Sequence, residues 1–145
     1  GVPHFVLLRP EGLAEAPVAR LGPALRRHAA FAPDGTNVNF VRFPASGAKR
    51  RMEIRTWERG VEAETLSCGT GVLAGAAAGL ALGAIELPLA VLTAGGFTLE
   101  VDATPRAEPF APGARWTLTG DARLLARGEL LPEAEEGPGG PARFG

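Results

Sequence analysis

The chain has 145 residues, of which 46% are apolar, and a formal net charge of −1 at pH 7. This length and apolar content allow one soluble domain with a buried core. The balanced charge, without a basic stripe or an aromatic platform, excludes a typical nucleic-acid-binding surface. Cys68 is the only cysteine, and His4 and His28 are the only histidines, which excludes an internal disulfide and a zinc site with the usual ligand count.

The start of the chain bears on its location and completeness. It lacks the charged and then apolar pattern of a signal peptide, so a cytoplasmic location is the default expectation. Gly1 is not an initiator methionine, and a strand-like apolar run follows within a few residues. We therefore expect a fragment or a processed product of a longer protein.

The N-terminal part is expected to alternate strands with one helix. Apolar residues predict a strand over residues 3–8, and helical spacing of apolar side chains predicts a helix over about residues 17–30. After an Asp-Gly turn, residues 37–43 alternate polar and apolar side chains as a half-buried strand does. A further strand is predicted over about residues 51–59, where a glycine ends it.

The C-terminal part reads as short strands separated by Gly-Gly, Pro-rich and Asp-containing turns. Strands are predicted over residues 87–93, 97–102, 116–118 and 123–126. The Pro/Glu/Gly-rich tail, residues 132–145, has too little apolar surface to bury and is expected to be disordered.

Residues 66–85 contain no charged side chain, which is compatible with a membrane span or with a helix enclosed in a soluble protein. The segment is mostly Ala and Gly, is bounded by Glu64 and Glu86 and lacks basic flanks. These features favour the enclosed helix, because spans are rich in larger apolar residues. An ordinary surface helix would show a charged outer face, and none is present.

Glycines recur at every fourth position of this segment, at Gly71, Gly75, Gly79 and Gly83, and so lie on one ridge of the helix. Each interior glycine costs about 0.5–1 kcal/mol relative to alanine, so a close backbone contact must compensate. We therefore predict an α+β fold in which a curled sheet surrounds this helix on every side.

Cys68 precedes this helix at the point where the loop ends. The free amides and positive dipole end of a helix N-terminus stabilise a thiolate, and the amides of Gly69, Thr70 and Gly71 can bind a carboxylate. Such a pair suits removal of a proton from the carbon beside a carboxylate. Alternatively, Cys68 is a small buried apolar residue without chemistry. A phosphate-binding loop lacks support, because the lysine of a P-loop is absent.

Four segments in order resemble the diaminopimelate epimerase family. Residues 58–60 read Glu-Arg-Gly, and residues 64–71 read Glu-Thr-Leu-Ser-Cys-Gly-Thr-Gly, like the family's second-cysteine signature with one additional loop residue. Residues 1–4, Gly-Val-Pro-His, and residues 36–40, Thr-Asn-Val-Asn-Phe, resemble two further family segments. The resemblance covers Gly1 to about Leu130.

The resemblance implies the C-terminal half of a cofactor-independent epimerase with a curled, barrel-like, mostly antiparallel sheet around a central Gly/Ala-rich helix. It implies conversion of LL- to meso-diaminopimelate by two cysteines on opposite faces of the α-carbon, without metal or imine. Cys68 is one of them, and the other belongs to an N-terminal half that this sequence does not contain. The domain is expected over residues 1–131, and a last strand over residues 122–130 is expected to pair with the missing half or in a homodimer.

The resemblance also assigns roles to individual residues. Asn37 contacts the amino-acid substrate, Glu58 binds its distal ammonium and Arg59 its distal carboxylate. Gly69 and Thr70 hold the reacting carboxylate. His4 and Glu58 match positions thought to tune the acidity of the catalytic cysteines.

The assignments of His4, Glu58 and Arg59 have alternative interpretations. Taken alone, His4 is typical of an edge strand, and Glu58 with Arg59 is typical of a solvated ion pair. Val2 replaces a common substrate-binding asparagine and puts the substrate in question. Two other functions stay open: a related amino-acid racemase of the same fold, and a small non-catalytic binding barrel.

Overall fold

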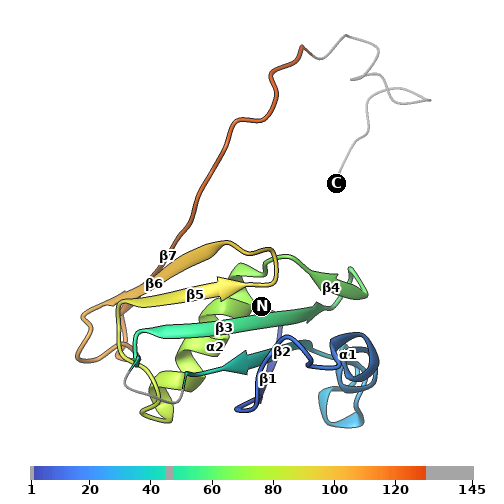
Figure 1. The fold of residues 1–145 in the computed structure, drawn as a ribbon. Coiled ribbons are helices and arrows are strands. Elements are labelled where there is room, and N and C mark those ends of the chain that lie inside the picture. The colour runs from blue at the N-terminus through green and yellow to red at the C-terminus, as the bar shows by residue number, and fades with distance from the viewer. Residues whose placement is uncertain (1, 45–47, 130–145) are drawn as a thin grey trace, which may run out of the picture.

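A seven-stranded mixed sheet forms the body of the chain (Figure 1). The computed structural model describes residues 2–44 and 48–129. Seven strands, two α-helices and one 3-10 helix follow in the order β1 (His4–Leu8), α1 (Val18–Arg26), η1 (Ala29–Phe31), β2 (Asn37–Arg42), β3 (Arg51–Glu58), β4 (Ala63–Thr65), α2 (Gly69–Ala81), β5 (Leu89–Thr93), β6 (Thr98–Thr104) and β7 (Arg115–Thr119).

The sheet runs in the order β1-β2-β3-β5-β6-β7, and β4 pairs with β3 beside this path. The β1–β2 and β3–β5 pairs are parallel, whereas β2–β3, β3–β4, β5–β6 and β6–β7 are antiparallel. This confirms the predicted α+β class with a curled, mostly antiparallel sheet.

Helix α2 packs against one face of the sheet, where it contacts β1, β2, β3, β6 and β7. The facing side chains form the main core, which includes Val41, Met52, Val72 and Val91. The expectation that strands surround the helix on every side stays a prediction. Residues 73, 74, 77 and 78 of α2 are only half-buried, and Leu73 packs against the main core.

Three of the four glycines form the predicted ridge, and the fourth has another role. Gly71, Gly75 and Gly79 are buried, and their missing side chains let Asn39, Met52 and other sheet residues approach α2. Gly83 lies beyond the helix, with a φ of +65°. Its amide bonds Leu80 O, and the next amide bonds Gly79 O, so it ends the helix with a Schellman motif.

Helix α1 covers the opposite face of β2 and β3, where Val18, Val38 and Phe40 form a second core. The helix is shorter than predicted. Pro17 is its N-cap, and the chain leaves the helix at Arg27 to form η1. The apolar spacing continues through this break and therefore gave no sign of it.

We predict that Gly22→Ala destabilises the contact between α1 and β3. A Cβ at position 22 would lie 2.6 Å from Cγ of Trp57, and such overpacking costs about 1–3 kcal/mol. Chemical unfolding of Gly22→Ala, Trp57→Leu and the double variant measures the cost. The double variant should be more stable than the sum of the single losses predicts, and strict additivity would contradict the steric explanation.

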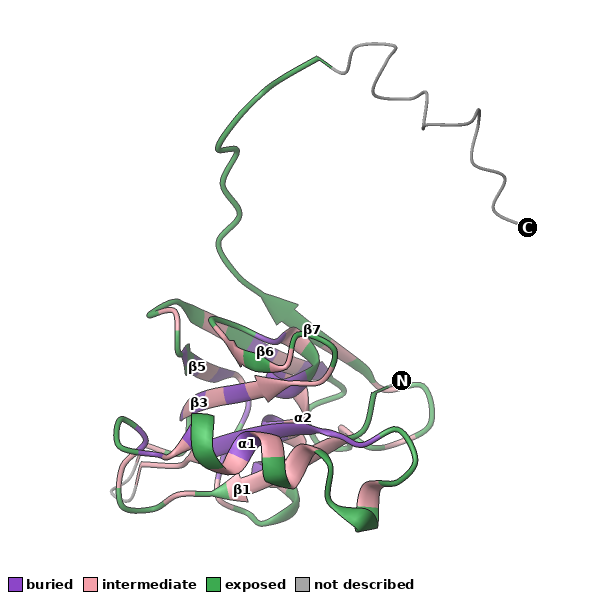
Figure 2. Cartoon of the chain, turned by 90° about the vertical axis from the view of Figure 1, so that its right-hand side faces the viewer, coloured by how far each residue is buried: buried purple, intermediate pink, exposed green. Residues whose placement is uncertain are grey.

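The remaining differences from the predicted elements lie at short segments. Strand β4 (Ala63–Thr65) is not among the predicted strands. Residues 123–126 form no strand: residues 120–129 are extended and exposed (Figure 2), because no neighbouring strand of the described chain pairs with them. The tail at residues 132–145 is outside the described residues.

Among residues 2–44 and 48–129, no helix is both long and apolar enough to cross a bilayer.

Candidate active site

Cys68 is the N-cap residue of α2, with an extended backbone and 8% exposure. The first bond of the helix is donated by the Val72 amide to Cys68 O, at 2.9 Å. In the described part of the chain, no protein acceptor pairs with the amides of Gly69, Thr70 and Gly71. Thr70 is exposed and Gly69 half-buried. The sulfur therefore lies beside open amides, as an anion site at a helix N-terminus requires.

Polar groups contact the Cys68 sulfur. The Thr70 hydroxyl is 3.6 Å from Sγ, and Asn37 Nδ2 is 4.0 Å from it. The Asn37 amide is held from its other side, because its Oδ1 accepts from the Arg59 backbone amide at 2.7 Å. Asn37 Nδ2 consequently points an N–H group at the sulfur. These contacts differ from those of an inert thiol buried in hydrocarbon.

His4 lies on β1 directly beside Asn37 of β2, as its partner in the parallel register. Its Nδ1 is 3.1 Å from Asn39 Nδ2. Burial lowers the pKa of His4 below its ordinary value of 6.5, and the negative charge of Glu58 acts in the opposite direction. Residues from β1, β2 and the end of β3 thus gather near the start of α2.

We predict that His4 makes the protein less stable in mildly acidic solution. Its pKa is lower in the folded protein than the 6.5 of the free side chain, so the unfolded chain binds more protons between these two values. The free energy of unfolding should therefore fall as the pH drops below about 6.5 and level off below the folded-state pKa.

Urea unfolding of the parent chain and of His4→Gln, at several pH values between about 5 and 8, measures this dependence. The carboxylates titrate mainly below about pH 5 and so leave this window clear. The variant should lose the dependence on pH, and an identical slope in both proteins would contradict the assignment to His4.

Glu58 and Arg59 do not form the ion pair with each other that the solvated alternative requires. Among the ion pairs of the described residues, neither takes part. The Arg59 guanidinium donates through Nη1 to the carbonyl of Asp34 at 3.3 Å, and its backbone amide holds Asn37. The structure thus links Arg59 to the Cys68 environment through its backbone.

Sequence reasoning missed a group of charges that fixes the loop after Arg59. Glu62, in the lengthened loop, has a φ of 57°. Its carboxylate accepts from Arg26 Nε at 2.7 Å, Arg27 Nη2 at 3.0 Å and the Gly60 amide at 3.3 Å. The Gly60 bond is the main cause that lowers the pKa of Glu62, with the two arginines adding to it. The loop is therefore tied to the end of α1.

Two buried polar residues beside the site were also missed. Asn39 and Thr56 face α2, and Thr56 Oγ1 donates to Asn39 Oδ1 at 3.0 Å. Polar side chains at core-facing positions of β2 and β3 are a signal that sequence alternation can reveal, since buried polar groups need partners. Strand β7 borders the same end, where a Cβ on Gly69 would lie 3.1 Å from Leu118 Cδ2.

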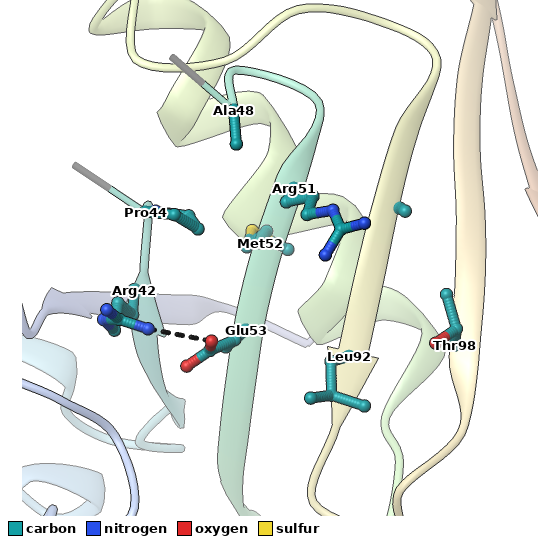
Figure 3. Close-up of a pocket in the computed structure, with 9 residues that line it drawn as sticks. Arg42, Pro44, Ala48, Arg51, Met52, Glu53, Leu92 and Thr98 are labelled. Atoms are coloured by element: carbon teal, nitrogen blue, oxygen red, sulfur yellow. Dashed lines mark hydrogen bonds and ion pairs between the residues drawn. The ribbon is translucent and has the colours of Figure 1, made fainter. Parts of the chain in front are cut away.

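A groove of about 500 Å³ lies elsewhere, and none of the predicted site residues lines it (Figure 3). Its Arg51, Glu53 and Leu92 alternate with core residues, so it opens on the face of the sheet away from α2. An Arg42–Glu53 ion pair of 2.8 Å crosses one side. Size alone does not make this groove the site, because no thiol or open helix terminus lies there.

The candidate site contains no recognisable metal centre in the part that the structure describes. There, no three His, Cys, Asp or Glu side chains are grouped as metal ligands. The groups near Cys68 are an amide, a hydroxyl and helix amides. At this site the Cys68 sulfur can accept a proton, and the helix amides can bind an anion beside it.

Comparison with known proteins gives a consistent result. A family model described as diaminopimelate epimerase matches residues 1–111. A diaminopimelate epimerase of Gemmatimonas aurantiaca is 44% identical over 90% of this chain and 47% of its own length. Those of Aquifex aeolicus and Halorhodospira halophila are 47% and 38% identical, over 70% and 99% of the chain and 36% and 46% of their own lengths. The chain thus spans about half the length of the curated relatives it matches.

Proposed function

The chain belongs to the diaminopimelate epimerase family, and on this premise we propose that it supplies one of two catalytic cysteines to a cofactor-independent epimerase. The reaction is conversion of LL-2,6-diaminopimelate to the meso form, a step toward lysine and peptidoglycan precursors. The observation that carries the proposal is the Cys68 sulfur, which lies beside the open amides of α2 and within 4.0 Å of Asn37 Nδ2.

The chemistry needs two groups on opposite faces of the α-carbon. The Cys68 thiolate removes the α-proton, or its thiol donates one, and a second cysteine from the N-terminal half acts on the other face. Inversion follows because the proton leaves on one side and arrives on the other. The amides of Gly69 and Thr70 bind the α-carboxylate and stabilise the negative charge that develops when the proton leaves.

Three further residues are assigned to the substrate, two of them to its distal end. Asn37 contacts the substrate, Glu58 binds the distal ammonium, and Arg59 binds the distal carboxylate. His4 and Glu58 adjust the acidity of the cysteines. The negative charge of Glu58, which acts to raise the pKa of His4, supports a coupling of these two residues. Val2 cannot form the hydrogen bond of the usual asparagine.

Residues 1–131 are proposed to form the C-terminal domain of the enzyme. Strands β1 and β7 are the two ends of the strand order and leave one edge each unpaired within this sheet. Residues 122–130 are proposed to pair as a strand with the N-terminal half, or with a second copy in a homodimer. Support comes from the exposure of Leu124 and Leu125, 81% and 90%, in an extended segment.

A second candidate is a racemase of the same fold that acts on amino acids without a distal carboxylate. Two observations favour it: Val2 stands at the asparagine position, and an Asp34 carbonyl accepts from the Arg59 guanidinium. Substrate competition separates the two. If Arg59 binds a second carboxylate, diaminopimelate should compete for the substrate site far better than alanine or proline.

The proposal is tested by assembling this chain with its N-terminal half and following LL-diaminopimelate by chiral chromatography. The assembled protein should form meso-diaminopimelate, and neither half alone should do so. Arg59→Lys, which keeps the charge but not the bidentate fork, should raise KM more than it lowers kcat. Equal conversion of alanine by the assembled protein would instead support the racemase.

A further inference from the structure

The orientation of the Asn39 side-chain amide is fixed from two sides. Asn39 is fully buried on β2. Its Nδ2 is 3.3 Å from the Phe5 carbonyl oxygen, and its Oδ1 accepts from Thr56 Oγ1 at 3.0 Å. A backbone carbonyl can only accept a hydrogen bond. The atom that faces Phe5 O must therefore be the nitrogen, and a flipped amide would place two acceptors against each other.

This orientation determines which ring nitrogen of His4 carries the proton. Asn39 Nδ2 has two hydrogens: one is directed to Phe5 O, and the other reaches His4 Nδ1 at 3.1 Å. Because this contact is donated by Asn39, Nδ1 must accept and carries no proton. A neutral imidazole with an unprotonated Nδ1 carries its proton on Nε2.

His4 Nε2 is buried and has no hydrogen-bond partner among the described residues. Asn39 thus occupies Nδ1 of the ring, while Nε2 is a donor without a partner. A buried donor without an acceptor is costly unless a ligand or another chain completes it. The register partner of His4 on β2 is Asn37, which contacts the Cys68 sulfur.

The same geometry disfavours protonation of the ring. Asn39 would raise the pKa of His4 if it accepted a hydrogen bond from the ring. The Phe5 carbonyl requires it to donate instead, and a donor facing Nδ1 favours the neutral form. Desolvation by burial, the largest cause, lowers the pKa in the same direction.

We propose that Asn39 is a positioning residue that holds neutral His4 in the Nε2–H tautomer, so that Nε2 is a fixed hydrogen-bond donor beside Asn37. The tautomer follows from contacts within this chain. Its use in epimerisation rests on the proposed function, in which Nε2–H donates to an anionic group of the assembled site, a thiolate or a substrate carboxylate.

Nitrogen-15 NMR of the assembled, histidine-labelled protein tests the tautomer directly, because the two ring nitrogens differ in shift when only one is protonated. The chain has two histidines, and His28→Gln identifies the signals of His4. We expect Nε2 protonated and Nδ1 unprotonated in the parent protein. Asn39→Asp, which puts a carboxylate where the donor was, should move the proton to Nδ1.

Thr56→Val is the matched control, since it removes the bond to Asn39 Oδ1 but leaves the Phe5 carbonyl in place. It should keep the Nε2–H pattern, and backbone spectra of each variant confirm that it is folded. An Nδ1–H signal in the parent protein, or an unchanged pattern in folded Asn39→Asp, would overturn the proposal.

Activity separates this inference from the proposed function. We expect Asn39→Asp to lower kcat about tenfold or more, which corresponds to about 1.4 kcal/mol in the barrier. An unchanged kcat together with a switched tautomer would remove His4 orientation from the reaction and leave the epimerase assignment intact. Absence of epimerisation by the assembled parent protein would contradict the proposed function, while the NMR pattern still decides the tautomer.

Discussion

Replacement of Cys68 by alanine is expected to lower the epimerisation rate of the assembled enzyme by about 10²–10⁴-fold, the contribution of one positioned proton-transfer group. The variant keeps the helix amides of Gly69 and Thr70 but has no group that exchanges a proton on that face. Substrate affinity should change much less than kcat, because the carboxylate contacts remain. Progress curves at several substrate concentrations give both constants.

Cys68→Ser is the matched control for packing. Its hydroxyl is close to the thiol in size and can still contact Thr70 Oγ1, but it is a far weaker acid. It should therefore be as stable as the parent protein and nearly as inactive as Cys68→Ala. Parent-like kcat in either folded variant would show that Cys68 does not transfer the proton.

Gly71→Ala is expected to destabilise the fold by about 1–3 kcal/mol, because it overpacks the contact between α2 and β2. A Cβ at this position would lie within van der Waals overlap of Asn39 Oδ1 and 3.4 Å from the Cys68 sulfur. Asn39 cannot move freely, since Thr56 and the Phe5 carbonyl hold its amide. The variant should thus lose both stability and activity.

Gly75→Ala, one turn along the same ridge, provides the comparison. Its Cβ would lie 3.1 Å from the flexible end of Met52 and 3.3 Å from Val41. Methionine adapts easily, and alanine gains up to about 1 kcal/mol of helix propensity. Urea unfolding should place this variant within about 1 kcal/mol of the parent chain. A larger loss for Gly75→Ala than for Gly71→Ala would contradict the fixed position of Asn39.

Much of this fold follows from local patterns in the sequence. Alternation located β2 and β3, and the change from loop to a charge-free Gly/Ala segment located the start of α2 at Cys68. These signals are local, because a strand or helix face that enters the core is mostly apolar whatever its partners are. The ridge of Gly71, Gly75 and Gly79 likewise reflects one close contact.

Other features depend on residues distant in sequence and could not be predicted. Glu62 adopts its left-handed conformation through bonds to Arg26 and Arg27 of another element. The amide of Asn39 is fixed by Phe5 and Thr56 from two neighbouring strands. The apolar pattern at residues 123–126 predicts a strand, but a strand forms only when a partner provides hydrogen bonds.

The most direct test of the central claim is solvent-deuterium incorporation at the α-carbon of each diaminopimelate stereoisomer, by the assembled parent enzyme and by Cys68→Ala. Two bases on opposite faces predict exchange from both stereoisomers in the parent. In the variant, the remaining cysteine should exchange the proton of one stereoisomer only. Undiminished exchange from both stereoisomers by Cys68→Ala would contradict a proton-transferring role for the Cys68 sulfur.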